Sequence, residues 1–514
     1  MFNSLLFHDI HHQPSKLTST ADFLTDLHLD QLLGAVRQVL DAAAIDSLLQ
    51  PLTDSTEVAY RQEIFADLAQ PKLRDALATF ATQMHRLDEQ REHLPHLFSA
   101  ESRWINLVSL LGNTEKAIAQ LTVVLENQPL TATGLQELNA YLQDYKNDEQ
   151  TKQLRADITK AEAAVTNLTY RLTFHGRKVT VVAHPKDEKT LASQLTTVFQ
   201  NVMDEPEDLH HPVKLKQPEA VGRLNNLQIS VVNQLVTLYP AEFSVLQKFQ
   251  QQYGDYQDGL LQRVAQELTF YLGWLQLEDR ITKRFPVQFT RPAISDSADE
   301  FANAAFDFNL ARTLLTDKQA QLITNDYRLD AQEQFIVISG PNQGGKTTYA
   351  RMVGEFYYVA ALGVPVPGKQ ATLRLRPKLA THFDRQESSQ PLTGLLANDI
   401  DRVHKIIQAA VPGELVIMNE LFSSTAAQDA EALAKQVLQR LADHGAEGIY
   451  VTFLSSLGAF PKTVSMMSQV TTNDQRTYKV IRHTIDDHAY ATVLLARYQL
   501  TQEDLEKGGE NNAR

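Results

Sequence analysis

The chain has 514 residues, 43% of them hydrophobic and 21% charged, which excludes a fibrous or wholly disordered protein. Its length predicts roughly three domains of about 150 residues each. A net charge of −14 argues against a protein that coats nucleic acid by bulk attraction. The absence of cysteine excludes disulfides and thiolate zinc sites, and no His-Glu-x-x-His spacing occurs. We therefore expect no structural metal.

Neither a membrane span nor an export signal is visible in the sequence. Apolar runs such as Phe335–Ile338 and Val493–Ala496 are far shorter than the roughly 18 residues that cross a bilayer. The N-terminal segment MFNSLLFHDIHH lacks a basic region followed by an apolar one. We therefore predict a cytoplasmic protein without a membrane partner.

Helical periodicity dominates the first third of the sequence. Apolar residues recur at intervals of three and four from Leu29 to Leu40 and again from Leu135 to Tyr145. The stretch from Arg155 to Val165 is rich in alanine and glutamate and contains no helix breaker. These patterns predict a helical core over residues 1–165.

The period then changes from helical to alternating. Apolar residues alternate from Leu168 to Phe174 and from Val179 to Ala183, which predicts a β-hairpin. With the helix-spaced residues that follow it (Leu191–Val202), this hairpin predicts a small α/β insertion over residues 166–225.

The hairpin tip is basic. It reads His175-Gly176-Arg177-Lys178, and either a solvated turn or a contact to a phosphate backbone would explain these residues. A helical stripe resumes from Leu261 to Leu275 and ends before Pro286. We predict lever helices and a connection over residues 226–300.

A glycine-rich motif follows the run of β-forming residues Phe335–Ile338 and matches the phosphate-binding pattern G-x-x-x-x-G-K-S/T. The residues predicted to bind the nucleotide are Gly340, Pro341, Asn342, Gln343, Gly344, Gly345, Lys346, Thr347 and Thr348. A helix is expected to begin here, so that its free N–H groups and positive dipole end face the phosphates of ATP. Lys346 is predicted to reach the β- and γ-phosphates, and the Thr347 hydroxyl to ligate Mg²⁺.

A second apolar run, Glu414–Glu420, ends in a carboxylate. At the tip of a parallel strand beside the loop, Glu420 could orient the attacking water, so Glu420 and Lys346 are the predicted catalytic residues. Asn419 stands where an aspartate usually holds the water shell of Mg²⁺, and we predict it as a metal-site residue together with Thr347. Because an amide carries no charge, weaker Mg²⁺ retention is expected.

Strands and helices alternate in the last 200 residues of the sequence. A helix is predicted over Ala426–His444, and Gly448–Phe453 has the composition of another central strand. The alternation predicts an α/β fold with a doubly wound parallel sheet over residues 301–514, preceded by the helical region and its insertion.

The segment Ser339–Thr348 closely resembles the phosphate loop of MutS-type DNA mismatch repair ATPases, which reads GPN-x-GGK-S/T-T. Leu415–Asp429 is similar to the carboxylate strand of that family and the loop after it. The resemblance places Asp429 near the nucleotide of a dimer partner. It is residue-specific from about residue 335 to residue 455.

Two further segments resemble MutS proteins more loosely. Ser388–Gly394 stands where the family keeps a signature segment that touches the γ-phosphate of the other subunit, although a polar loop that caps a helix at Thr393 fits equally well. Leu322–Asp326 stands where the family forms part of its adenine pocket. MutS proteins also place a helical core and lever, interrupted by a DNA-holding clamp, ahead of the ATPase region.

The resemblance implies a homodimeric, DNA-binding ATPase that acts as a nucleotide-controlled clamp with ATP and Mg²⁺. Because the sequence contains no Phe-x-Glu motif, we expect no direct reading of mismatches, and we also expect no C-terminal nuclease. Phe453 stands where the family has a histidine, and with Asn419 it predicts slow turnover. The alternative is a nucleotide-sensing scaffold with negligible hydrolysis that engages a protein partner, which the net charge of −14 and Asn419 favour.

Overall fold

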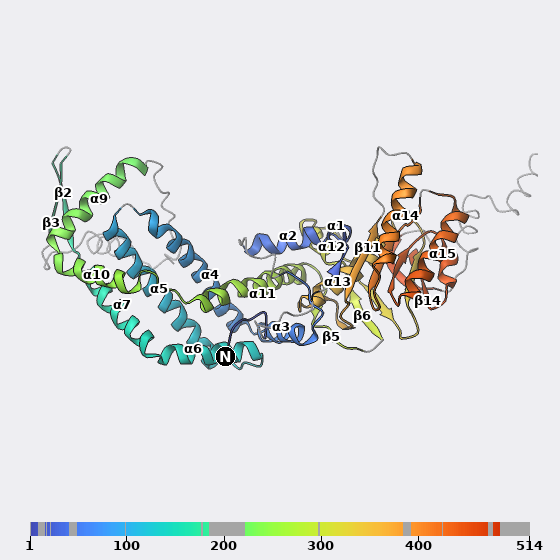
Figure 1. The fold of residues 1–514 in the computed structure, drawn as a ribbon, viewed down its shortest axis with the longest axis horizontal. Coiled ribbons are helices and arrows are strands. Elements are labelled where there is room, and N and C mark those ends of the chain that lie inside the picture. Colours follow the sequence, from blue (N-terminus) through green and yellow to red (C-terminus); the bar gives the residue numbers. More distant parts are fainter. Residues whose placement is uncertain are drawn as a thin grey trace, which may run out of the picture. The chain divides into compact units, whose positions relative to one another are not determined.

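The computed structural model consists of two units (Figure 1). It describes residues 2–8, 16, 18–20, 22–40, 49–97, 99–175, 178–183, 221–296, 299–383, 392–423, 425–470 and 476–483. Unit 1 contains Asp75–Pro129 and Glu137–Gln266, and unit 2 contains Phe2–Arg74, Leu130–Gln136 and Glu267–Arg514. Several helices run from one unit into the other. No helix in the described ranges has the length and apolar character needed to span a membrane.

The described part of unit 1 is helical apart from one hairpin. Its helices, some of which continue into unit 2, are α4 (Pro71–His93), α5 (Ala100–Asn127), α6 (Thr133–Asn147), α7 (Glu149–Asn167), α9 (Val221–Leu238), α10 (Pro240–Tyr253) and α11 (Gly259–Arg284). Side chains cap the starts of α5 and α7, because Ser99 accepts a hydrogen bond from the Ser102 amide and Asp148 accepts one from the Thr151 amide. The helices predicted at Leu135–Tyr145, Arg155–Val165 and Leu261–Leu275 are confirmed.

The hairpin of unit 1 pairs β2 (Tyr170–His175) with β3 (Lys178–Ala183) in antiparallel register, with His175 opposite Lys178. The alternating pattern therefore predicted it correctly. Its tip residues Gly176 and Arg177 and the predicted helix over residues 191–202 lie outside the described residues.

Unit 2 is built on a seven-stranded sheet. Its strands, in spatial order, are β1 (Thr18–Ser19), β11 (Lys378–Phe383), β12 (Leu415–Asn419), β13 (Glu447–Val451), β8 (Phe335–Ser339), β14 (Thr463–Val470) and β15 (Arg476–Arg482). Neighbouring strands are parallel except for the β14–β15 pair, so the predicted parallel sheet is confirmed. Every residue of β8 and of β12 is buried, which explains their continuous apolar sequences.

Helices cover both faces of this sheet. Side chains of β8 and β12 such as Val337 and Met418 pack in one apolar cluster with α14 (Leu392–Gln408) and α15 (Ala427–Asp443). On the opposite face lies α13 (Lys346–Ala361), where a Cβ at Gly354 would come within 2.9 Å of Ile417 Cδ1. Leu27 Cδ1 would be closer still, at 2.6 Å, so the packing of α13 against the sheet and the N-terminal segment favours glycine here.

The N-terminal segment of the chain completes unit 2. Its helices are α1 (Phe23–Asp26), α2 (Leu29–Leu40) and α3 (Ser55–Asp67), and β1 adds an edge strand with Thr18 beside Lys378. The α13 helix is held from this side, because the Tyr358 hydroxyl donates to the Leu49 carbonyl (2.7 Å). Just past the end of α13, Arg61 Nη1 donates to the Leu362 carbonyl (3.0 Å).

Smaller elements connect these parts. A four-stranded sheet has the order β5 (Ala293–Ile294), β10 (Gln370–Leu373), β6 (Glu300–Ala305) and β7 (Asn325–Leu329). A two-stranded pair joins β4 (Phe289–Thr290) to β9 (Val366–Pro367), and α12 (Phe308–Thr313) follows β6. The fully buried Glu300 of β6 pairs with Arg374 (2.7 Å) and Arg376, and Arg376 Nη1 also pairs with Glu447 of β13 (2.7 Å). These ion pairs join the small sheet to the large one.

Candidate functional site

The glycine-rich loop lies between β8 and α13, at the edge of the sheet where the parallel strands have their carboxyl ends. Gly340 (φ 117°) and Gly345 (φ 93°) have left-handed backbone conformations, which glycine adopts without strain. Gly345 is the N-cap of α13, so the unpaired N–H groups of its first turn lie beside the loop. The sequence prediction that residues 340–348 connect a strand to a helix start is thus confirmed. Such a junction is suited to binding an anion.

Two of the loop glycines pack against the neighbouring strand β14. A Cβ at Gly340 would lie 2.4 Å from Ser468 Oγ, and one at Gly344 would lie 2.5 Å from the same atom. Any side chain at either position would displace the loop from the strand. The loop is therefore supported from one side by β14, whose contribution the sequence did not reveal.

Lys346 points back over the loop. Its Nζ donates to the carbonyls of Gly340 (2.9 Å) and Pro341 (3.0 Å), and lies 4.6 Å from the ring centre of Phe453. The residue is only 4% exposed, and burial lowers the pKa of its ammonium while the charge of Glu420 opposes that shift. Within the described ranges no carboxylate lies within ion-pair distance of Nζ. The positive charge of this ammonium is therefore available to an anionic ligand.

The predicted metal-site residues are in contact. Thr347 Oγ1 donates to Asn419 Oδ1 at 2.9 Å. The strand register explains this contact: Asn419 at the end of β12 is paired with Val451 of β13, and Val451 is paired with Ile338 of β8, the strand that leads into the loop. The Thr347 hydroxyl and the Asn419 amide each offer a neutral oxygen ligand, and Glu420 follows in the sequence with a carboxylate. Such a set suits Mg²⁺, which prefers oxygen ligands and keeps several waters. The residues present therefore fit this ion.

Glu420 follows Asn419 at the same edge of the sheet. Its amide donates to the Val451 carbonyl (2.9 Å) and its φ is 55°, so the chain turns sharply as it leaves the strand. The side chain is half-buried. Since β13 alone separates β12 from β8, Glu420 is about 10 Å from the start of the loop, at the usual strand spacing. A phosphate chain and one water would fill a gap of this size.

Strand β15 also lines the loop, and the sequence prediction missed it. The Asn325 side chain donates to the Tyr478 carbonyl (3.2 Å) and accepts from the Val480 amide (2.8 Å). Tyr478 is half-exposed, and a Cβ at Gly345 would lie 3.5 Å from its Cα. The segment predicted to form part of a base pocket, Leu322–Asp326, is therefore held beside the loop. The alternation of apolar and polar residues at Val464, Ser465 and Met466, which matches the alternating burial of this strand, was the sequence signal that could have identified this hairpin.

The sequence also named Asp429 and the segment Ser388–Gly394. Asp429 lies in the first turn of α15 with its side chain exposed. Of the signature-like segment Ser388–Gly394, residues 388–391 fall outside the described residues. Phe453, by contrast, lies directly over Lys346 and is 51% exposed.

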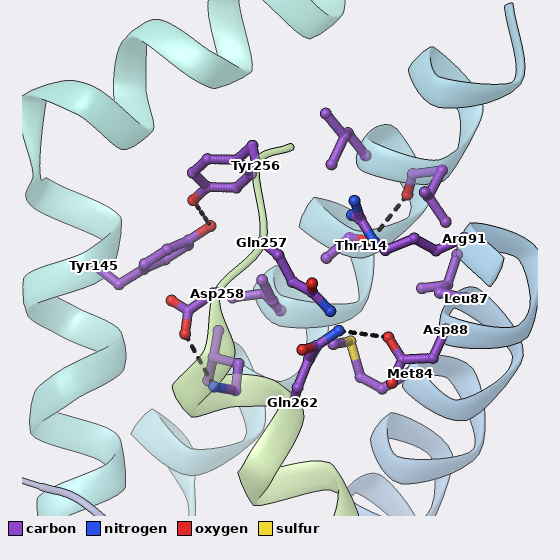
Figure 2. A pocket seen from close by; sticks show the side chains of 14 residues that line it. Met84, Leu87, Asp88, Arg91, Thr114, Tyr145, Tyr256, Gln257, Asp258 and Gln262 are labelled. Atoms are coloured by element: carbon purple, nitrogen blue, oxygen red, sulfur yellow. Dashed lines mark hydrogen bonds between the residues drawn. The ribbon is translucent and has the colours of Figure 1, made fainter. Parts of the chain in front are cut away.

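A separate cavity lies inside unit 1 (Figure 2). Its volume is about 20 Å³, which is enough for about one water molecule. Polar side chains bond to one another across it, since Gln262 Nε2 donates to Asp88 Oδ1 (2.6 Å) and the hydroxyls of Tyr145 and Tyr256 are 3.2 Å apart. The cavity is too small for a substrate, and its contacts join the helices of unit 1. No group of three or more histidine, aspartate or glutamate side chains that could hold a metal ion occurs in the part of the chain that the structure describes.

The fold and the loop together define an α/β protein whose central parallel sheet presents an anion-binding loop at the start of a helix. The family model of MutS domain V matches residues 336–492, a range that contains this loop together with β12 and β13. Residues 336–492 of the chain are thus similar to domain V of the MutS family.

Relatives of two kinds are similar to this chain. Endonuclease MutS2 of Pediococcus pentosaceus is 24% identical over 445 residues, which cover 84% of this chain and 53% of the relative. Endonuclease MutS2 of Thermus thermophilus is 30% identical over 138 residues (27% and 18%), and DNA mismatch repair protein MutS of a Thermotoga species is 25% identical over 140 residues (27% and 18%). The chain thus spans about half, or less, of the length of these relatives.

Proposed function

We propose that the chain is a DNA-associated ATPase that binds ATP with Mg²⁺ at residues 340–348 and converts it slowly to ADP and phosphate. The observation that carries this proposal is the buried Lys346 ammonium, which lies inside a glycine-rich loop at the start of α13. A buried cation without a carboxylate partner in the described ranges, next to free helix N–H groups, suits a polyphosphate.

Each residue of the site then has a role that its position supports. Lys346 and the first amides of α13 bind the phosphates, and Tyr478 offers an exposed aromatic surface next to the loop for the base. Thr347 and Asn419 would hold Mg²⁺, which when bound neutralises the charge of the phosphates. Glu420 accepts a hydrogen bond from the attacking water and orients it toward the terminal phosphate.

The relatives motivate the rest of the proposal. They are named as an endonuclease MutS2 and a DNA mismatch repair protein MutS, which supports our proposal that this chain acts on DNA. The resemblance of its loop to that of MutS-type ATPases supports the further proposal of a cytoplasmic, homodimeric clamp controlled by nucleotide. Direct mismatch reading is not part of the proposed function, since the sequence contains no Phe-x-Glu motif.

One observation favours a second candidate function. Asn419 is neutral and its amide oxygen accepts the Thr347 hydroxyl, so the metal site lacks the charge that would hold Mg²⁺ firmly. Weak Mg²⁺ binding would suffice for the nucleotide-sensing scaffold, which binds ATP, hydrolyses it negligibly and engages a protein partner.

Measurements of DNA binding distinguish the nucleotide-controlled clamp from the nucleotide-sensing scaffold. We expect affinity for linear, branched or mismatched duplexes that changes with ATP and weakens with salt, because phosphate contacts release counterions. Fluorescence anisotropy at several salt concentrations, with and without ATP, measures this. The scaffold predicts no ATP-sensitive affinity for any of the three DNAs, and that result would overturn the clamp.

Dimerisation with nucleotide is a further expected result. A single loop leaves the γ-phosphate open on one side, and a second copy of the chain would cover it, so ATP and Mg²⁺ should favour a symmetric dimer. Light scattering at micromolar protein gives the mass, and the Lys346→Ala variant is the control that should not respond. A monomer at saturating ATP and Mg²⁺ would contradict the dimeric site.

A further inference from the structure

An arginine of β15 contacts the glycine-rich loop from outside. Arg476 is the first residue of this strand, and its Nη1 donates to Gln343 Oε1 at 2.6 Å. Both side chains are exposed. Gln343 lies three residues before Lys346, in the most exposed part of the loop, and has a left-handed backbone conformation (φ 59°). The guanidinium is therefore positioned by the loop itself.

Arg476 differs from the other arginines of this region in its partner. Arg482, on the same strand, makes a bidentate ion pair with Glu333 (2.8 and 2.9 Å), and Arg376 pairs with Glu300 and Glu447. Among the described residues no carboxylate lies within ion-pair distance of Arg476. One of its five N–H donors bonds a neutral amide, and its positive charge is not balanced by any neighbour in these ranges.

The position of Arg476 relative to the loop follows from the strand register. Arg476 is paired with Val470 of β14, two residues beyond Ser468, which packs against Gly340 and Gly344. Tyr478, two residues after Arg476 on β15, lies against Gly345. The strand pair thus runs along the loop, and Arg476 lies at the end where the loop is most exposed.

We propose that Arg476 is a second cationic contact for the phosphate chain of the nucleotide. This inference rests on the proposed function and adds to it a residue outside the loop motif. On binding, the guanidinium exchanges the neutral Gln343 amide for phosphate oxygens, which accept stronger, charge-assisted and often bidentate hydrogen bonds. In the absence of nucleotide, the hydrogen bond to Gln343 keeps the Arg476 side chain beside the loop.

Binding affinities of matched variants test this role. We expect Arg476→Met to weaken ATP and ADP binding by about 10- to 100-fold, the usual effect of losing a hydrogen bond to a charged group. Arg476→Lys keeps the charge and should recover part of the affinity. The matched control is Arg482→Met, which removes the same charge from the same strand and should leave both affinities unchanged. Titration calorimetry gives the dissociation constants, and thermal melting checks the fold.

The salt dependence of binding separates a direct contact from a structural role. If Arg476 binds phosphate, the affinity of Arg476→Met should fall less steeply with salt than that of the parent, because one ionic contact is missing. Equal nucleotide affinities of the parent and Arg476→Met, or an equal loss of affinity in Arg482→Met, would overturn the role of Arg476 and leave the proposed function standing. A parent protein that binds no nucleotide would overturn the proposed function and this inference together.

Discussion

Lys346→Ala is expected to abolish ATP binding while the fold stays intact. Among the described residues the ammonium donates hydrogen bonds to the loop carbonyls of Gly340 and Pro341, both within the site, so its loss removes the cation that faces the phosphates. Loss of a charged contact in a buried site should weaken binding on the order of 10²-fold or more. Alanine also favours the first turn of α13, so helix formation should not suffer.

Titration calorimetry with ATP and Mg²⁺ measures the loss in Lys346→Ala, and circular dichroism checks the helical content. Lys405→Ala is the matched control, because Lys405 is an exposed lysine of α14 whose partner is Asp401 (2.6 Å), one turn away. It should bind ATP like the parent. Unchanged ATP affinity in Lys346→Ala would show that the nucleotide site lies elsewhere.

Glu420→Gln is expected to keep ATP binding and to reduce turnover by about 10²- to 10⁴-fold, the usual range for losing a general base. Glutamine keeps the shape of the side chain and loses the acceptor charge that orients the attacking water. Asn419→Asp should have the opposite effect, because a carboxylate beside the Thr347 hydroxyl strengthens Mg²⁺ binding and thereby speeds hydrolysis.

A steady-state phosphate-release assay on the parent and both variants decides between the ATPase and the scaffold. Glu431→Gln serves as control, since this carboxylate on the exposed part of α15 pairs with Lys435 and should not affect the rate. Equal rates in the parent, Glu420→Gln and Asn419→Asp would remove the catalytic role of Glu420 and favour the scaffold.

The central strands and the loop were predictable because their signals are local. Phe335–Ile338 and Leu415–Asn419 are continuous apolar runs that end in turn residues, a pattern typical of strands buried on both faces. The loop motif fixes a strand before it and a helix after it, and both occur where expected. Contact between Thr347 and Asn419 follows once these strands lie parallel and close together in one sheet.

The surroundings of the loop were not predictable in the same way. Ser468, Arg476 and Tyr478 reach the loop only because β14 pairs with β8, and a single sequence does not reveal which strands become neighbours. Periodicity likewise identified the helix at Leu29–Leu40, and could not show that the segment before it contributes an edge strand to a distant sheet. Long-range pairing depends on the whole folded structure.

The edge strand β1 has a consequence for how the protein is made. The Thr18 hydroxyl donates to the carbonyl of Pro377, 359 residues later in the chain. At about 5 to 20 residues per second, a ribosome needs about 20 to 70 s to synthesise the intervening segment. Throughout that time the N-terminal segment has emerged without the strand that it pairs with. The large sheet therefore forms late in synthesis, and a fragment that starts near residue 300 would leave β11 as an unprotected edge.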